Sequence, residues 1–177
     1  MYFANFPFIV YDSVGNGDFK IVTNLLKRVA LRTKVRTNTL LYDTYDVKNG
    51  ETPEMLADKL YDDPELHWVI LYVNNITDRY HQWPLNSAQF NAFVNDKYTD
   101  INAVHHFEIA QTSGDTTLKI DIGTDTTGYS ELDLTTITNY DFEIERQDDL
   151  RKIRLLDGAY IEQFVEEFET LMGASIL

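Results

Sequence analysis

The chain has 177 residues and carries a formal net charge of −14. With 44% hydrophobic and 25% charged residues, its composition is that of a folded globular protein and not of a disordered one. It contains no cysteine, which excludes disulfide bonds, thiolate metal ligands and a cysteine nucleophile. The absence of cysteine fits a protein made in a reducing cytoplasm.

The charge is unevenly distributed along the chain. Residues 1–40 hold six basic and two acidic residues, a net charge of +4, and the remainder carries −18. A nucleic-acid-binding protein needs a dominant basic face, so this distribution argues against nucleic acid as a partner. It suits electrostatic docking between proteins, with a basic arm on one neighbour and an acidic body facing another. Solubility explains the same distribution equally well.

The N-terminal run "MYFANFPFIVY" is apolar but is not a membrane segment. It is far shorter than the roughly 20 residues of a spanning helix. It also lacks the basic start and the small-residue cleavage site of a signal peptide. The sequence therefore predicts no membrane partner and no export.

Residues 6–12, "FPFIVYD", predict an extended segment, and the cluster "DSVGNGD" predicts a loop after it. Residues 18–34 predict a helix that Asp18 caps. Its outer face carries Lys27, Arg28 and Arg32. Its apolar stripe is spaced at helical intervals and comprises Ile21, Leu25 and Val29.

Residues 39–48, "TLLYDTYDVK", predict a strand that ends at Asn49-Gly50. Thr52 then caps a helix, with Pro53 at the favoured first position. Asp63-Pro64 repeats this pattern and begins a second helix, "LHWVILYVNN", which is apolar nearly all round. We expect that second helix to be the most buried element of the chain.

The remaining sequence predicts a short helix within 83–98, capped near Asn86 or Ser87, and then a change to alternating segments. Antiparallel strands are expected at 105–111, 117–123 and 137–145, and a further strand at 150–157. From Gly158 a C-terminal helix is predicted. Its apolar stripe comprises Ile161, Phe164, Val165, Phe168, Leu171 and Met172.

The polar clusters do not predict a catalytic or metal site. His105 and His106 are adjacent, and neighbouring side chains of a strand point to opposite faces, so the pair does not suit one metal ion. The acidic residues of 121–133 do not meet the EF-hand pattern and predict a polar hairpin loop. No P-loop, Gly-x-Ser-x-Gly elbow or dinucleotide fingerprint is present. We expect no enzymatic activity and no cofactor.

The aromatic residues are the best candidates for a binding surface. Trp68 is expected in the core, whereas Trp83, beside Pro84 in a loop, is expected as an exposed anchor. An N-terminal arm this aromatic would be insoluble if it were left free, so it must be buried in its own domain or in a partner. Its aromatic residues are Tyr2, Phe3, Phe6 and Phe8.

Residues 45–80 resemble a LysM module. "YDVKNGETPEMLADKLY" is similar to the opening strand and first helix of that family, and "LHWVILYVNNI" is similar to its second helix and closing Asn-x-Ile. The resemblance implies a βααβ fold with the second strand just after Ile76. It also implies, as an alternative function, peptidoglycan binding in a shallow groove. That groove would comprise Gly50, Glu51, Thr52, Pro53, Asn74, Asn75 and Ile76.

The segment "DDPELHWVILYVNNITDRYHQWP" resembles the small LysM-containing baseplate wedge subunits of T4-type contractile-tailed phages. Both ends of the chain are similar to that family as well. The resemblance implies a structural protein of the virion tail baseplate, assembled in the host cytoplasm. It would complete each wedge and link neighbouring wedges around the hub by protein contacts, without a cofactor.

Together these features predict an α+β fold with a LysM-like βααβ module, antiparallel strands and a C-terminal helix. The expected divisions are an arm and basic helix at 1–40, the module at 41–82, a connecting helix at 83–104, and strands with the C-terminal helix at 105–177. The interface with other wedge proteins is predicted to use Tyr2, Phe3, Phe6, Phe8, Arg28, Arg32, Arg36, Trp83, Phe164 and Phe168.

Overall fold

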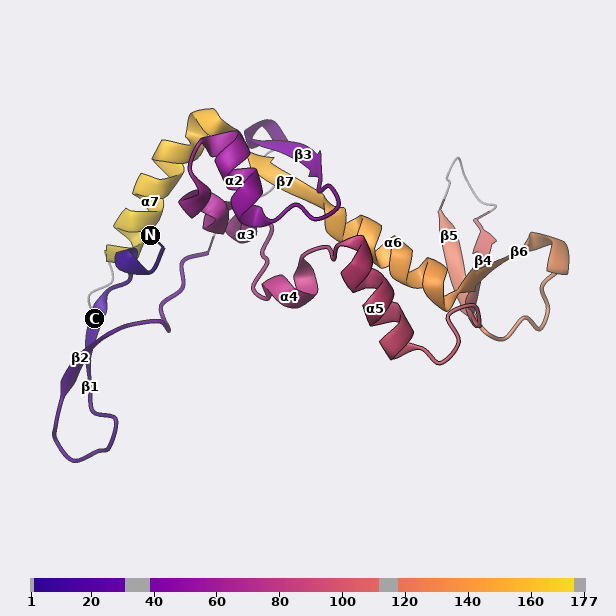
Figure 1. Ribbon diagram of the computed structural model, residues 1–177, viewed down its shortest axis with the longest axis horizontal. Helices are drawn as coiled ribbons and strands as arrows, with labels where there is room; N and C mark the ends of the chain where they lie inside the picture. The colour runs from indigo at the N-terminus through magenta and orange to yellow at the C-terminus, as the bar shows by residue number, and fades with distance from the viewer. Residues whose placement is uncertain (1, 31–38, 112–117, 174–177) are drawn as a thin grey trace. The chain divides into compact units, whose positions relative to one another are not determined.

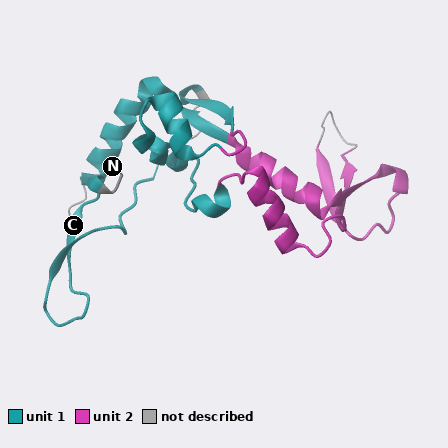
Figure 2. Cartoon of the chain, in the orientation of Figure 1, with its two compact units in different colours: residues 1–46, 51–82, 153–177 teal, residues 47–50, 83–152 magenta. Residues whose placement is uncertain are grey.

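The computed structural model describes residues 2–30, 39–111 and 118–173 (Figure 1). Helices and strands are mixed along the chain, as the α+β prediction requires. The chain divides into two compact units (Figure 2). Unit 1 comprises residues 1–46, 51–82 and 153–177, and unit 2 comprises residues 47–50 and 83–152.

Unit 1 begins with a β-hairpin where a helix was expected. After the 3-10 turn η1 (Tyr2–Asn5), strand β1 (Phe8–Tyr11) pairs antiparallel with β2 (Lys20–Thr23). The predicted helix 18–34 is therefore wrong over its described part, and residues 31–38 lie outside the described residues. The β-branched run of β2 has a strand partner in β1, and this pairing outweighs the helical spacing of a few apolar residues.

The segment resembling LysM forms a strand and two helical elements, as predicted. The 3-10 turn η2 (Thr39–Leu41) leads into β3 (Tyr42–Asp46), and α2 (Pro53–Tyr61) follows. The next elements are η3 (Pro64–Leu66), α3 (His67–Val73) and α4 (Arg79–Gln82). The strand expected just after Ile76 is wrong, because residues 79–82 are helical.

The strand that pairs with β3 comes from the far end of the sequence. It is β7 (Lys152–Leu156), followed by η5 (Gly158–Tyr160) and α7 (Ile161–Gly173). Val47 N–H donates to Arg151 O over 3.0 Å, and Asp157 N–H donates to Leu41 O over 3.1 Å. From Leu41 to Val47 the residue numbers rise, while those of their partners fall from Asp157 to Arg151. The strands β3 and β7 are therefore antiparallel.

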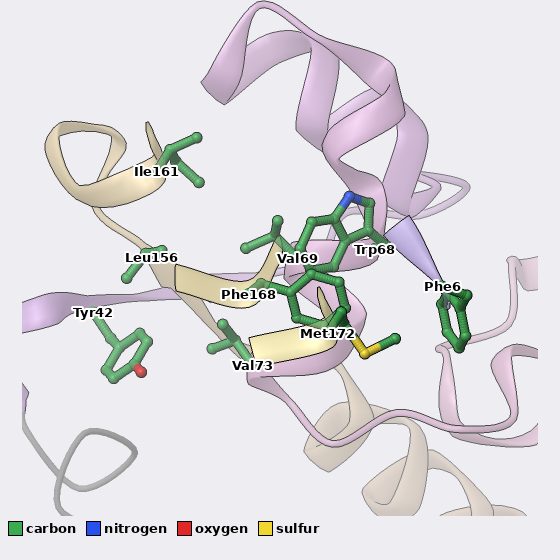
Figure 3. Packing of buried hydrophobic residues seen from close by; sticks show 9 residues of the cluster. All are labelled: Phe6, Tyr42, Trp68, Val69, Val73, Leu156, Ile161, Phe168 and Met172. Carbon is green, nitrogen blue, oxygen red and sulfur yellow. The ribbon is translucent and has the colours of Figure 1, made fainter. Parts of the chain in front are cut away.

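The core of unit 1 lies where α3 meets α7 and β7 (Figure 3). The Trp68 and Phe168 rings lie 4.6 Å apart between centroids, and Tyr72 meets Phe168 edge-on at 5.7 Å. Tyr61 donates its hydroxyl to Leu156 O over 3.0 Å, and burial raises the pKa of Tyr61 to about 12. The buried cluster consists of Phe6, Tyr42, Trp68, Val69, Val73, Leu156, Ile161, Phe168 and Met172.

Unit 2 packs two helices with a small antiparallel sheet. Its elements are α5 (Ser87–Lys97), β4 (Val104–Ala110), β5 (Lys119–Gly123), η4 (Glu131–Asp133), β6 (Leu134–Thr138) and α6 (Asn139–Arg151). The sheet order is β5-β4-β6, with both pairs antiparallel. Asn86 caps α5 through a capping box with Gln89, close to the predicted position.

The strand predicted at 137–145 is confirmed only at its first two residues, which end β6, and is wrong beyond them, because α6 begins at Asn139. A capping box between Thr138 and Asp141 starts this helix. The residues it buries are Glu143 and Gln147, four positions apart, so its inner face is polar and the apolar alternation of the sequence misleads.

Ion pairing and hydrogen bonds satisfy the buried carboxylate of Glu143. Lys97 Nζ lies 2.6 Å and the Tyr98 hydroxyl 2.8 Å from Glu143 Oε1. Burial raises the pKa of Glu143, but these hydrogen bonds outweigh the burial and hold the pKa below its ordinary value of 4.5. The pair joins α5 to α6, and removing Lys97 would leave the Glu143 carboxylate buried without its charged partner, which destabilises a fold.

Candidate protein-docking surface

The loop predicted as the first half of a glycan groove is engaged in holding α2 to β3. The Tyr45 hydroxyl donates to the Glu51 carboxylate at 2.9–3.0 Å, and Lys59 completes this cluster at 3.6 Å from Glu51. Thr52 Oγ1 accepts the Met55 N–H and caps the helix, and Pro53 is buried. Gly50, at φ 80°, makes the turn before them.

The loop predicted as the second half ends α3 and holds β7. Asn74 Oδ1 accepts the Arg154 N–H at 2.8 Å, and Asn74 Nδ2 donates to Arg154 O at 2.7 Å and to Ile70 O at 2.8 Å. Asn75 adopts φ 56°, and Ile76 N–H donates to Leu71 O over 2.8 Å. The residues Asn74 and Asn75 thus end α3 and, through Asn74, connect it to β7 within unit 1.

Three of the seven aromatic residues predicted for an interface are buried within the chain, and a fourth is half-buried. Phe6 and Phe168 belong to the core of unit 1, and Phe164 packs against it. Trp83 is only 6% exposed, so its prediction as an exposed anchor is wrong. A neighbouring proline does not determine whether a side chain is exposed, and Trp83, the first residue of the second segment of unit 2, has a buried side chain.

The other predicted interface residues divide into exposed ones and ones without a described side chain. Phe8 is 72% exposed, and Arg28 is exposed as well. Tyr2 and Phe3 belong to η1, but their side chains fall outside the described part of the chain. Arg32 and Arg36 also lie outside the described residues.

The hairpin β1–β2 presents an apolar face to solvent. Phe8 pairs with Thr23 and Val10 with Ile21, so these four side chains share one face. Phe8, Val10 and Ile21 are 72%, 66% and 76% exposed. An isolated two-stranded hairpin is marginal in water, and a bare apolar face of this kind marks an interaction site. Phe8 is among the residues that the sequence predicts for an interface, whereas Val10 and Ile21 are not, and the sequence predicts Ile21 within a helix.

The tip of this hairpin is held by one carboxylate. Asp12 accepts hydrogen bonds from the backbone N–H groups of Val14, Gly15, Asn16 and Gly17 at 2.7–3.3 Å. The bond from Gly17 is the largest of the effects that lower the pKa of Asp12. The hairpin therefore has a defined turn before any partner binds.

The hairpin is also anchored at both of its ends. Phe6 precedes it in the core of unit 1. After it, Lys27 donates to Leu171 O over 2.9 Å and to Met172 O, and the Tyr72 hydroxyl donates to Val29 O. The exposed face consequently lies on a segment fixed to the core and not on a free tail.

The histidine pair of unit 2 lies together, contrary to expectation. The ladder of β4 and β6 shifts by one residue between Val104 and His106, which makes His105 the extra residue of a β-bulge. The two Nδ1 atoms lie 2.9 Å apart, and His105 stacks on Phe142 at 3.9 Å. Among the described residues no group of three or more histidine or acidic side chains is arranged to hold a metal ion.

Acidic residues of the predicted hairpin loop cap local turns. Asp121 accepts the Gly123 N–H at 2.7 Å and Asp125 accepts the Thr127 N–H at 3.0 Å.

Within the part of the chain that the structure describes, none of the helices combines the length and apolarity needed to cross a bilayer. The exposed hairpin face is thus the feature that most directly points to function.

A fixed, apolar and exposed strand face is typical of a protein that assembles with other proteins. The profile of the family described as "Base plate wedge protein 53" matches residues 1–115, and the chain belongs to this family. It is accordingly a structural component of a phage tail baseplate. The match includes the hairpin and the segment resembling LysM.

A similarity to one curated protein covers most of the chain. The baseplate wedge protein gp53 of Enterobacteria phage T4 is 24% identical over 146 residues, which cover 75% of this chain and 74% of that protein. The recognition of a baseplate wedge subunit from the sequence is thereby confirmed.

Proposed function

We propose that the chain fastens baseplate subunits together, completing each wedge and linking neighbouring wedges around the hub. The family supports a place in the virion baseplate, with other baseplate proteins as partners. The observation that carries the proposal is the hairpin face of Phe8, Val10 and Ile21, which is exposed although its segment is anchored. Fastening of this kind needs protein contacts alone, without catalysis or a cofactor, and proceeds in the host cytoplasm.

Within this interface the apolar residues supply the affinity and the basic residues steer the approach. A buried apolar or aromatic anchor is worth about 2 kcal/mol or more when it is truncated. An exposed ion pair is worth under about 1 kcal/mol. Arg28, a few residues after the hairpin in the sequence, is exposed, and Arg32 and Arg36 follow it in the sequence. The aromatic Tyr2 and Phe3 remain predicted members of the interface.

We further propose that unit 1 uses a LysM-like frame as a docking scaffold. β3, α2, η3 and α3 follow in the order that the resemblance implies, and β7 supplies the second strand in place of one after Ile76. In this frame the loop at 50–53 connects β3 to α2, and the loop at 74–76 connects α3 to β7, through hydrogen bonds within the chain. Nothing observed favours the alternative of peptidoglycan binding. The divisions at 1–40, 41–82, 83–104 and 105–177 stay a prediction about functional segments.

The experiment is the incorporation of variants into baseplates. The full chain with Val10→Asp and Ile21→Asp is compared with the full chain carrying Met55→Asp, a change at a side chain that is 59% exposed on α2. Point substitutions are preferred to deletion of residues 1–10, which would remove Phe6 from the core. We expect the hairpin variant to fold and to lose incorporation by at least about tenfold, with Met55→Asp unaffected. Wild-type incorporation of the hairpin variant would reject the proposal.

A further inference from the structure

The hairpin β1–β2 leaves unit 1 between two fixed points. Before it, Phe6 is buried in the core. After it, the chain returns to the core at Val29, whose side chain packs against the buried cluster and whose carbonyl accepts the Tyr72 hydroxyl. Asn24 N–H donates to Pro7 O over 2.8 Å and closes the base of the hairpin between these points. The direction of the hairpin therefore depends on what holds the chain between Asn24 and Val29.

Lys27 lies within that segment and is bonded to the end of the C-terminal helix. Its Nζ donates to Leu171 O over 2.9 Å and to Met172 O, and 144 residues separate Lys27 from Leu171 in the sequence. Both carbonyls belong to the last turn of α7, next to the start of the hairpin (Figure 1). The carbonyls of a last turn have no N–H partner further along their own helix, so Lys27 satisfies groups that α7 leaves open.

The helix α7 has no cation of its own at this end. Its last turn contains no basic residue. All of its charged residues are acidic and exposed, and they are Glu162, Glu166, Glu167 and Glu169. The carbonyl end of a helix carries partial negative charge, and a cation placed there is favourable. The Lys27 ammonium thus supplies both the hydrogen-bond donor and the positive charge that the end of α7 lacks.

Packing does not hold the residues between the hairpin and Lys27. Leu25 and Leu26 are 60% and 88% exposed. Leu26 N–H donates to Asn24 Oδ1 over 3.1 Å, which shapes the turn locally. After β2, Lys27 is the first described residue that bonds to another helix or strand. The contact nearest to the hairpin that can set its direction on this side is therefore the bond from Lys27 to α7.

We infer that Lys27 is a positioning residue for docking: by holding the end of α7, it fixes the direction in which the hairpin presents Phe8, Val10 and Ile21. The inference rests on the proposed function and deepens it, because it names the group that orients the docking face. A binding element that is already oriented loses less freedom when it binds, and its affinity is higher for that reason. Without the Lys27 bonds the hairpin keeps its strands and its apolar face but loses its fixed direction.

The test measures the direction of the hairpin separately from its assembly. The sequence contains no cysteine, so two spin labels can be attached to the full chain at Val14→Cys, in the hairpin tip, and at Met55→Cys, on α2. Both side chains are exposed and both belong to unit 1. The distribution of distances between the labels is measured by pulsed electron spin resonance for the parent chain and for Lys27→Met, Lys27→Gln and Lys27→Arg. The matched control, Lys48→Met, removes the same charge from an exposed site in unit 2.

We expect a narrow distance distribution in the parent chain, in Lys27→Arg and in the control, and loss of the narrow distribution in Lys27→Met and Lys27→Gln. Incorporation of these last two variants into baseplates should fall by roughly tenfold, since orientation must then be gained on binding. Arginine restores the cation and its donors, so Lys27→Arg should recover both the narrow distribution and incorporation. A narrow distribution in Lys27→Met and Lys27→Gln, or their incorporation at the level of the parent chain, would overturn the inference.

The hairpin variant Val10→Asp with Ile21→Asp separates this inference from the proposed function. Loss of incorporation by that variant, together with parental behaviour of Lys27→Met, overturns the positioning role and leaves the proposed function standing. Loss of incorporation by both variants, with a broad distance distribution in Lys27→Met, supports both. Parental incorporation of the hairpin variant rejects the proposed function and the docking role of Lys27 with it.

Discussion

Asn74 provides the sharpest test of how the loop at 74–76 is used. Its side chain makes three hydrogen bonds at 2.7–2.8 Å, two of them to the backbone of Arg154 in β7. Each such bond contributes about 0.5–1.5 kcal/mol net, and a half-buried site admits some compensating water. We therefore expect Asn74→Ala to lower the free energy of unfolding of unit 1 by about 2–3 kcal/mol.

The assay is urea unfolding followed by tryptophan fluorescence in a Trp83→Phe background, so that Trp68 alone reports unit 1. With an m value of about 1–3 kcal/mol/M, the midpoint should fall by roughly 0.7–3 M. Asn75→Gly is the matched control, because Asn75 is exposed at φ 56°, a conformation that glycine adopts freely. A loss of free energy of unfolding below about 0.5 kcal/mol for Asn74→Ala would refute the claim that this residue holds α3 to β7.

Three further outcomes are expected from the packing and the capping of the chain. Phe168→Ala should cost about 3–5 kcal/mol in urea unfolding, whereas Leu171→Ala, at a residue 45% exposed, should cost under about 1 kcal/mol; equal costs would contradict the assigned face of α7. Because the pKa of Glu143 is lowered, its stabilisation is present above about pH 4.5 and is lost as the pH falls through the folded pKa. The free energy of unfolding of unit 2, followed by Trp83 fluorescence in a Trp68→Phe background, should therefore fall less steeply with acid in Glu143→Gln than in the parent chain, and an equal fall would argue against this role. Thr138→Ala should lower the helical circular dichroism of α6 near its transition and cost about 1 kcal/mol, and no loss would mean that the capping box is not formed.

Local signals predicted the helix starts well. Thr52 with Pro53 and Asn86 with Gln89 were recognisable because a cap and its backbone partner lie within a few residues. The same signal is present at Thr138 and Asp141, but it overlaps an apolar alternation over 137–145 that favours a strand. The buried positions there are Glu143 and Gln147, and hydrophobic pattern does not reveal a polar inner face.

Long-range pairing could not be predicted from the sequence. The partner of β3 is β7, more than a hundred residues further along the chain, and no local feature specifies that choice. The same limit applies to the docking face, since Ile21 has helical spacing with Leu25 but forms a strand opposite Val10. Burial of Trp83 likewise depends on tertiary packing and not on its neighbouring proline.

Hydrogen exchange compared between the free chain and assembled baseplates tests the central claim most directly. The apolar face of the hairpin is predicted to be the part that assembly covers, so the backbone amides of 8–11 and 20–23 should exchange rapidly in the free chain and become protected in the baseplate. The loops at 50–53 and 74–76 should show the same protection in both states, because their bonds are already formed within the chain. Protection gained in those two loops, with none gained in the hairpin, would contradict the account.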